Sequence, residues 1–245
     1  MKIETILTPA ELPALAGRDW GGTACVVFDI LRATSTFVTA LQNGAQQIIP
    51  VGEIPEAIAW RERQPDVLLA GERDGVKIRA AQSGGVDFDF GNSPREFRPE
   101  KVRGKTIVST TTNGTRALRA CAGAKVVLAG AFLNLAATAK FLNQSPPEEL
   151  LLVCAGTGAG VALEDVLAAG ALAGIFGGDF SDATEVAARA FLSAKPDLPA
   201  VLASSRNAQR LLSIPELRAD VAFCAQRDVF KLAAVMGADG AIRKA

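Results

Sequence analysis

The chain contains no histidine and no tyrosine, and its 26 Lys and Arg residues balance 26 Asp and Glu residues, so it carries no net charge. Without histidine, any acid–base or metal chemistry must use Asp, Glu, Lys, Cys and bound water. Without a run of positive charge, nucleic-acid binding is not expected. The four cysteines lie far apart and form no Cys-x-x-Cys pair, which excludes a zinc ribbon and a thioredoxin-like motif.

Long apolar segments are missing as well. The uncharged run at residues 166–176 is about half the length that a membrane span requires. Residues 1–7 carry an acidic residue early and lack the apolar centre of a signal peptide. Three of the cysteines lie in apolar, strand-like runs, which is typical of reduced core thiols. We therefore expect a soluble, cytoplasmic protein with no membrane partner.

Short apolar runs alternate with longer helical ones along 245 residues, of which 49% are hydrophobic. Most of the short runs are apolar throughout, as in strands whose two faces are both buried. Strands are expected at residues 24–29, 47–51, 67–71, 106–110, 126–130, 150–155 and 221–224. Helices are expected at residues 33–43, 55–62, 115–122, 135–142, 164–175, 183–191, 208–212 and 229–236. This order predicts an α/β fold of three α/β/α layers with a mostly parallel sheet.

Residues 143–147 contain two prolines and interrupt the pattern, and the sequence becomes more helical after them. We interpret this break as the link between two α/β subdomains, residues 1–142 and residues 148–245. The alternative is one domain in which the break is a loop.

Polar clusters follow four of the expected strands. They are Asp29, the Glu72-Arg73-Asp74 group, the hydroxyl-rich residues 109–116, and the glycine-rich residues 156–160 with Glu164-Asp165 beyond them. Ligands of parallel α/β sheets bind at the carboxyl ends of strands. The four loops are therefore predicted to converge on one site.

Asp29 ends an apolar strand and is followed within a few residues by Arg32 and three hydroxyls. The start of this stretch resembles the haloacid-dehalogenase-type motif, but Leu31 stands where a second Asp is needed. The carboxylate could instead bind Mg²⁺, and Arg32 could bind a phosphate or sulfonate. The alternative is an acidic helix cap with a surface arginine.

The other clusters also allow two interpretations. Residues 109–116 suit a phosphate-binding loop or a turn with a capped helix. Residues 156–160 lack the third glycine of a dinucleotide fingerprint and any Walker lysine. Glu164 and Asp165 would repel a bare phosphate, but Mg²⁺ bound between them and the phosphate would remove this repulsion. The alternative is that they only stabilise the first turn of a helix, where acidic side chains are favourable. Glu72-Arg73-Asp74 offers metal and anion contacts or is only a charged turn. Residues 92–96 predict a capping box with Ser93 as N-cap.

Taken together, these motifs resemble the 2-phosphosulfolactate phosphatase family. The resemblance is carried, in order, by residues 27–36, 71–73, 91–94, 111–118 and 154–157, then Glu164-Asp165, Ala169-Gly170, Asp220-Val221, Cys224 and Asp228. It covers the chain from about residue 24 to about residue 230. One departure is the segment 78–87, which is longer than the expected link before the Gly-Asn-Ser-Pro motif.

The resemblance implies a Mg²⁺-dependent hydrolase that releases phosphate from 2-phospho-3-sulfolactate and gives 3-sulfolactate, in the route toward coenzyme M. Asp29 and Arg32 would be catalytic, and Mg²⁺ would lie among Asp29, Glu72 and Asp165. The implied substrate-binding residues are Arg73, Asn92, Ser93, Thr111, Thr112, Asn113, Gly114 and Thr115.

Several alternatives stay open. Asp29 could attack phosphorus, or a metal-activated water could do so. The lack of histidine excludes histidine-phosphatase and purple-phosphatase mechanisms. The substrate could be another small phosphorylated hydroxy acid, or the protein could bind anions without turnover. A homodimer is the default expectation for a soluble enzyme.

Overall fold

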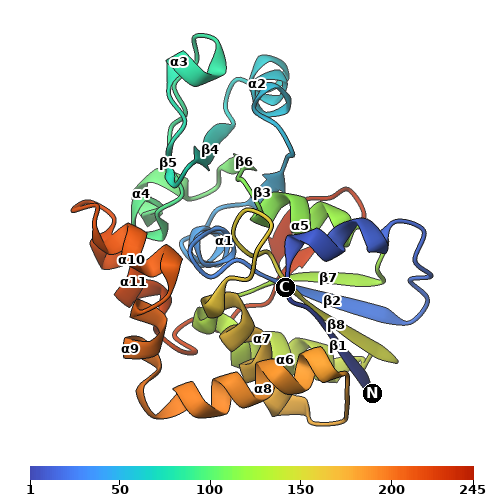
Figure 1. Ribbon diagram of the computed structural model, residues 1–245. Coiled ribbons are helices and arrows are strands. Elements are labelled where there is room, and N and C mark those ends of the chain that lie inside the picture. Colours follow the sequence, from blue (N-terminus) through green and yellow to red (C-terminus); the bar gives the residue numbers. More distant parts are fainter.

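Eleven strands form one sheet, and helices cover both of its faces (Figure 1). The computed structural model describes residues 1–245 and confirms the three-layer α/β fold with a mostly parallel sheet. The strands are β1 (Lys2–Ile6), β2 (Thr23–Phe28), β3 (Gln47–Pro50), β4 (Leu68–Arg73), β5 (Val76–Lys77), β6 (Thr106–Thr110), β7 (Val126–Gly130), β8 (Glu149–Cys154), β9 (Asp179–Phe180), β10 (Ala234–Met236) and β11 (Ile242–Lys244).

The sheet consists of two parallel blocks, with spatial order β5-β4-β6-β3-β11-β10-β7-β2-β8-β1-β9. The short block contains β4, β6 and β3, and the long block contains β7, β2, β8, β1 and β9. The antiparallel hairpin β10–β11 lies between them, because β10 pairs with β7 and β11 pairs with β3. All six residues of β2 are buried, which explains its apolar sequence at the centre of the long block.

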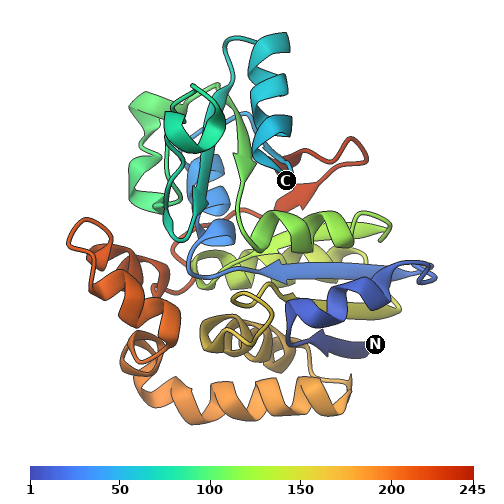
Figure 2. The same cartoon turned by 45° about the horizontal axis from the view of Figure 1, so that its top comes forward.

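The helices are α1 (Ala33–Gln42), α2 (Ile54–Arg63), α3 (Ala80–Ser83), α4 (Pro99–Val102), α5 (Gly114–Ala120), α6 (Leu135–Gln144), α7 (Leu163–Phe176), α8 (Asp182–Ala194), α9 (Leu198–Ala203), α10 (Arg206–Leu212) and α11 (Arg218–Cys224). Four 3₁₀ turns join them: η1 (Pro9–Leu15), η2 (Pro94–Glu96), η3 (Phe132–Asn134) and η4 (Lys195–Asp197). In Figure 1, α5 lies on one side of the long block and α6, α7 and α8 lie on the other. The short block carries α2 and α3 and projects from the rest of the molecule, as the turned view in Figure 2 also shows.

The segment 143–147 connects α6 to β8, which lies inside the sheet between β2 and β1. Residues from before and after this segment therefore share one sheet and one hydrophobic core cluster of 59 buried residues. A second cluster of 9 residues lies in the short block. The interruption of the sequence pattern at residues 143–147 thus does not coincide with a break in the sheet. The sheet is divided instead between its two parallel blocks, at the β10–β11 hairpin.

Two predicted elements are wrong. Residues 221–224 belong to α11 instead of a strand, because a four-residue apolar run does not distinguish a strand from a buried helical turn. Within the predicted helix 229–236, the last three residues form β10, whose partner β11 follows after a tight turn. The buried, free state of all four cysteines confirms the prediction of core thiols. None of the helices combines the length and apolarity needed to span a membrane.

Candidate active site

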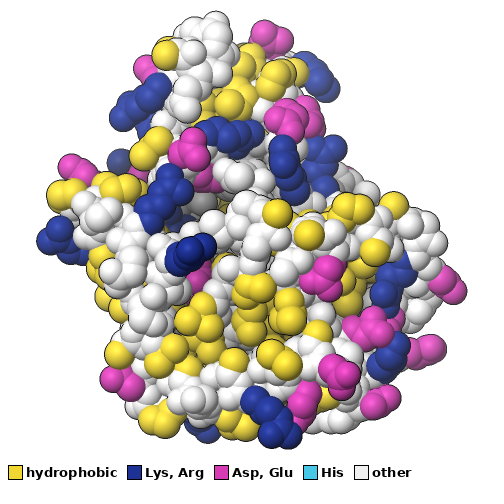
Figure 3. Space-filling view, in the orientation of Figure 1, with side chains coloured by type: hydrophobic (Ala, Val, Ile, Leu, Met, Phe, Trp, Pro, Cys, Tyr) yellow, Lys and Arg dark blue, Asp and Glu magenta, His cyan; other side chains and the backbone are white.

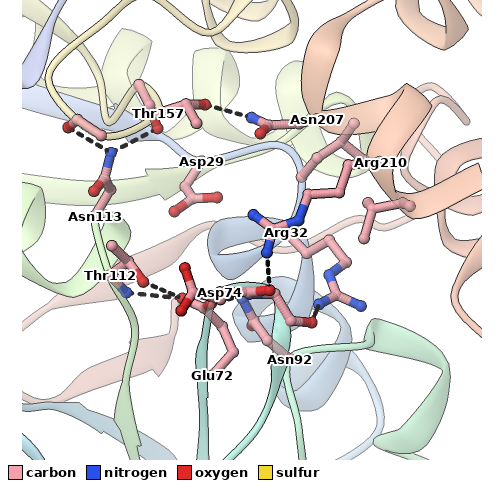
Figure 4. A pocket seen from close by; sticks show the side chains of 15 residues that line it. Asp29, Arg32, Glu72, Asp74, Asn92, Thr112, Asn113, Thr157, Asn207 and Arg210 are labelled. Atoms are coloured by element: carbon pink, nitrogen blue, oxygen red, sulfur yellow. Dashed lines mark hydrogen bonds between the residues drawn. The ribbon is translucent and has the colours of Figure 1, made fainter. Parts of the chain in front are cut away.

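A cavity of about 320 Å³ opens where β2, β4, β6 and β8 end, on the side that faces α10 (Figure 4). Of its fifteen lining residues, only Leu31 and Leu211 are hydrophobic. In the space-filling view, Lys and Arg side chains surround a hollow beneath the α2–α3 region (Figure 3). The four polar loops therefore meet at one cavity, as predicted from their places after strands, although the two strand blocks run in opposite directions.

Asp29 lies directly after β2 and faces the cavity. Its Oδ1 accepts a 3.0 Å hydrogen bond from the Ala33 backbone N–H, and Oδ2 accepts none. Burial raises the pKa of Asp29 to about 7, and the charges of Glu72 and Glu164 act in the same direction. The fold thus holds a carboxylate where its charge is disfavoured unless a cation approaches.

Gly114 allows this placement. A Cβ atom at residue 114 would lie 2.5 Å from Asp29 Oδ2 and 2.7 Å from the Ala33 Cβ. Any larger residue would displace the carboxylate or the start of α5. Gly114 therefore shapes the site without lining it.

Glu72 ties two of the loops together. Its Oε1 accepts hydrogen bonds from the Thr112 backbone N–H (2.8 Å) and hydroxyl (2.9 Å), and its Oε2 accepts one from the Gly75 N–H (2.7 Å). Asp74 and Gly75 form the two-residue turn between β4 and β5, with φ of 54° and 76°. Asp-Gly is a favoured pair for such a turn because both positions need positive φ.

Asp165 joins the ends of two strands. Its Oδ1 accepts a hydrogen bond from the Ile30 N–H (2.8 Å) and its Oδ2 accepts one from the Gly156 N–H (3.0 Å). Burial, followed by the charges of Asp29 and Glu164, raises the pKa of Asp165 well above its usual value. Both oxygens already serve the backbone, and the side chain does not line the cavity.

The neighbouring Glu164 is different. Asn207 donates a 2.6 Å hydrogen bond to its Oε1, whereas its Oε2 is buried and has no hydrogen-bond partner. A buried acceptor without a partner is costly unless a donor or cation satisfies it.

Arg32 is held in a buried ion pair. Its guanidinium contacts Asp220 Oδ2 at 2.8 Å and the Gly75 carbonyl at 2.6 Å, and the Ser93 hydroxyl donates to Asp220 Oδ1 at 2.7 Å. The exposed fractions of the Arg32 and Asp220 side chains are 3% and 0%. Asp220 lies on α11, so this pair fastens the C-terminal helices to the start of α1.

This arrangement corrects the expected capping box. Ser93 does precede η2, with Pro94 in its first position, but the Ser93 side chain makes no cap hydrogen bond. It serves Asp220 instead, and Glu96 accepts a 2.8 Å hydrogen bond from the Gly91 N–H.

Asn92, Thr112 and Asn113 line the cavity together with Asp29, Arg32 and Glu72. The Asn113 amide donates to the carbonyls of Ala155 (3.0 Å) and Gly156 (2.8 Å), which positions the loop after β8. These six residues are the sequence-derived candidates that the structure brings together around the cavity.

The other candidates lie outside the lining. Thr111 and Thr115 are buried and bond to each other's backbone, which caps the start of α5. Arg73 points toward the Glu72 carbonyl and the Thr110 hydroxyl. The long segment 78–87, which carries α3, lines no part of the cavity and lies at the far end of the short block (Figure 1).

The sequence did not predict that α10 forms one wall of the cavity. Asn207 donates 2.6 Å hydrogen bonds to Thr157 and Glu164, and Arg210 donates to the Asp74 carbonyl. Leu211 completes this wall. The only local signal was a short helical pattern behind the Ser205 cap, which carries no chemical motif.

The site contains no ready-made cluster of three His, Cys, Asp or Glu side chains around one ion position. Its donors nevertheless suit Mg²⁺, which binds carboxylate oxygens and completes its shell with water and substrate oxygens. Asp29 Oδ2 accepts no hydrogen bond, Glu164 Oε2 is buried without a partner, and Glu72 faces the cavity. The pKa of Asp29 is raised in part by its acidic neighbours, a repulsion that a divalent cation would remove.

A polar cavity at strand ends, lined by both carboxylate and guanidinium groups, defines an α/β protein built for a small anionic ligand. The family model described as "2-phosphosulpholactate phosphatase" matches residues 7–238. A "Probable 2-phosphosulfolactate phosphatase" of Thermotoga petrophila is 44% identical over 207 residues, covering 84% of this chain and 86% of the relative. A protein of the same name from Thermosynechococcus vestitus is 35% identical over 243 residues, or 95% of each chain. The chain belongs to the 2-phosphosulfolactate phosphatase family, a family of phosphoric monoester hydrolases.

Proposed function

We propose that this protein hydrolyses 2-phospho-3-sulfolactate to 3-sulfolactate and phosphate with the help of Mg²⁺. The observation that carries the proposal is the cavity itself, in which the Asp29 and Glu72 carboxylates face the Arg32 and Arg210 guanidinium groups. A substrate with phosphate, carboxylate and sulfonate groups needs a cation on one side and guanidinium donors on the other. The cavity volume of about 320 Å³ suits a small acid.

Asp29 and Glu72, with Glu164 behind them, are the residues that would hold the metal. When bound, Mg²⁺ supplies charge neutralisation for the phosphoryl oxygens and lowers the pKa of a bound water. Asp165 keeps the ends of β2 and β8 together, and thereby keeps Asp29 beside the loop at residues 156–158.

Arg32 and Asn92 would orient the substrate. Asp220 and the Gly75 carbonyl fix the Arg32 side chain, so little rotamer freedom is lost when it binds an oxyanion. The Asn92 side chain lines the cavity, and its backbone carbonyl is fixed by a 2.9 Å hydrogen bond from Thr36.

Asp29 has two candidate roles, metal ligand or nucleophile. Its free Oδ2 suits either role. The stereochemical course at a chirally labelled phosphorus distinguishes them. Retention indicates two displacements through a phosphoenzyme, whereas inversion indicates direct attack by water and would exclude Asp29 as nucleophile.

The decisive experiment measures phosphate release from 2-phosphosulfolactate by the purified protein, with Mg²⁺ and with EDTA. We expect Mg²⁺-dependent release that Asp29→Asn abolishes. Tight binding of the substrate without turnover would instead support a non-catalytic anion-binding protein. Equal kcat/KM for non-sulfonated phosphoesters would show that another phosphorylated hydroxy acid is the substrate.

The setting of the reaction is part of the same proposal. The four free, buried cysteines support a reducing compartment such as the cytoplasm. The 3-sulfolactate product would serve the route toward coenzyme M.

A further inference from the structure

We propose that Arg210 binds the sulfonate group and thereby determines the preference for a sulfonated substrate; this inference rests on the proposed phosphatase function. Arg210 lies on α10, outside the strand-end motifs that supply Asp29, Glu72 and Arg32 to the cavity. Its side chain extends from α10 into the cavity beside Asp74 (Figure 4).

The two guanidinium groups of the cavity differ in how their charge is balanced. Arg32 forms its ion pair with the buried Asp220. Arg210 has no carboxylate within ion-pair distance and donates only to the backbone carbonyl of Asp74. Arg210 is therefore the lining arginine whose positive charge is left for a ligand.

The chemistry of the substrate assigns its groups to the two sides. Phosphate and carboxylate oxygens are good ligands for a hard cation, so they belong with Asp29 and Glu72. A sulfonate is a much weaker base and a poor metal ligand, but its oxygens match the planar N–H donors of a guanidinium. The side of the cavity formed by α10 is thus the favourable place for the sulfonate.

A purely structural role for Arg210 makes a different prediction. The bond to the Asp74 carbonyl could simply fasten α10 to the β4–β5 turn. Loss of such a fastening would loosen the cavity for every substrate by a similar factor. Recognition of the sulfonate affects only substrates that carry this group.

The experiment compares Arg210→Met with wild type on 2-phosphosulfolactate and on 2-phospholactate, which lacks the sulfonate. We expect kcat/KM for the sulfonated substrate to fall by about 10- to 100-fold, mainly through KM, since one charge-assisted contact is lost. For 2-phospholactate we expect a change of less than about 3-fold. An equal loss on both substrates would overturn the inference.

Arg206→Met is the matched control, because it removes the same charge from the same helix at a side chain that does not line the cavity. We expect it to leave both kcat/KM values near wild type. Arg210→Lys keeps the positive charge but lacks the planar pair of N–H donors, so it should keep part of the preference for the sulfonated substrate. It also serves as the test if Arg210→Met does not fold. An Arg210→Lys enzyme that loses activity equally on both substrates would also overturn the inference.

Wild-type behaviour separates this inference from the proposed function. If wild type releases no phosphate from 2-phosphosulfolactate, the proposed function fails, and the sulfonate assignment fails with it. If wild type is active and the Arg210 variants lose activity equally on both substrates, only the sulfonate assignment fails.

Discussion

The cavity has two walls that are built in different ways. The sheet wall, formed by the loops after β2, β4, β6 and β8, holds its carboxylates through backbone N–H groups, as with Asp29, Glu72 and Asp165. The helical wall is formed by α10, with α11 next to it. These helices are joined to the sheet wall by a few side chains, mainly Asn207 and Asp220. A carboxylate that accepts hydrogen bonds from backbone N–H groups keeps its position when neighbouring side chains change. A hydrogen bond between two side chains is lost when either residue is substituted.

The two walls carry different groups for binding the substrate. The sheet wall carries the groups that would handle phosphate and metal, and the helical wall carries the unpaired guanidinium of Arg210. Substrate preference can therefore change through α10 while the acidic side of the cavity stays as it is. The following predictions test how independent the two walls are.

The largest effect is expected from Asp29→Asn in the sheet wall. The change keeps the shape of the side chain and removes the cavity-lining carboxylate whose Oδ2 accepts no hydrogen bond. We expect kcat to fall by about 1000-fold or more, equivalent to roughly 4 kcal/mol of barrier. Folding should not weaken, because a charge disfavoured by burial is removed. Phosphate release and thermal melting measure the two effects, with the exposed Asp66→Asn as control. Substantial turnover by Asp29→Asn would show that this carboxylate is dispensable.

Asp220→Asn tests the joint between the walls. The variant keeps the hydrogen bond from Ser93 but leaves the Arg32 guanidinium buried without a counter-charge. Breaking one partner of a buried ion pair costs about 3–5 kcal/mol, so we expect a loss of stability of that order in denaturant unfolding. Glu185→Gln, in an exposed pair with Arg189, is the matched control and should change stability very little. If the two variants unfold at the same denaturant concentration, the Arg32–Asp220 pair does not fasten α11.

The acidic side of the cavity should make stability depend on pH. The pKa of Asp29 is about 7 in the folded protein, against an ordinary value of 3.8, so folding retains a proton that the unfolded chain releases between these values. The stability contributed by the protonated form is present below about pH 4 and is lost as the pH rises to about 7. The raised pKa of Asp165 acts in the same direction. Melting temperature should therefore fall across this range without metal, and Asp29→Asn should flatten the slope.

Mg²⁺ should reverse this trend, because it binds the deprotonated carboxylates. A concentration of about 100 times Kd stabilises a protein by roughly 2.7 kcal/mol. We expect a larger rise in melting temperature at pH 8 than at pH 5, where protons compete with the metal. An equal rise at both pH values, or an undiminished rise in Asp29→Asn, would contradict a metal site at Asp29.

The sequence pattern predicts the residues of the sheet wall better than those of the helical wall, because the strands have a local signature and the helix contacts do not. Strands buried on both faces have an apolar signature, and the carboxyl ends of parallel strands lie along one edge. The nearness of Asp29 to the loop after β8, and of Glu72 to Thr112 after β6, therefore follows from the parallel pairs within each block. The meeting of the two blocks at one cavity does not follow from this rule, because the blocks run in opposite directions. The order of the strands across the two blocks was not foreseeable, because the β10–β11 hairpin that joins them is short and has no strong pattern.

The helical wall depends on contacts between residues far apart in the chain. Asp220 meets Arg32 across 188 positions, and Asn207 meets Thr157 across 50. Nothing local to α10 or α11 encodes these partners, and the apolar run in α11 resembled a strand. Likewise, sequence alone did not distinguish Asp165, whose oxygens serve the backbone, from Glu164, which keeps a free oxygen.

The smallest effect is expected from Asn207→Ala, which weakens the helical wall and leaves the sheet wall intact. The variant removes two 2.6 Å hydrogen bonds and leaves Glu164 without a partner on either oxygen, which should cost about 1–2 kcal/mol. We expect faster amide hydrogen exchange in α10 and a drop in kcat/KM of about 3- to 10-fold. Gln209→Ala is the control on the same helix, because its side chain bonds only to the Ala203 carbonyl. If Mg²⁺ binding restores the stability lost in Asn207→Ala, the metal satisfies Glu164 and the two walls are coupled through that residue. If exchange in α10 stays at the wild-type rate, Asn207 does not hold the helical wall.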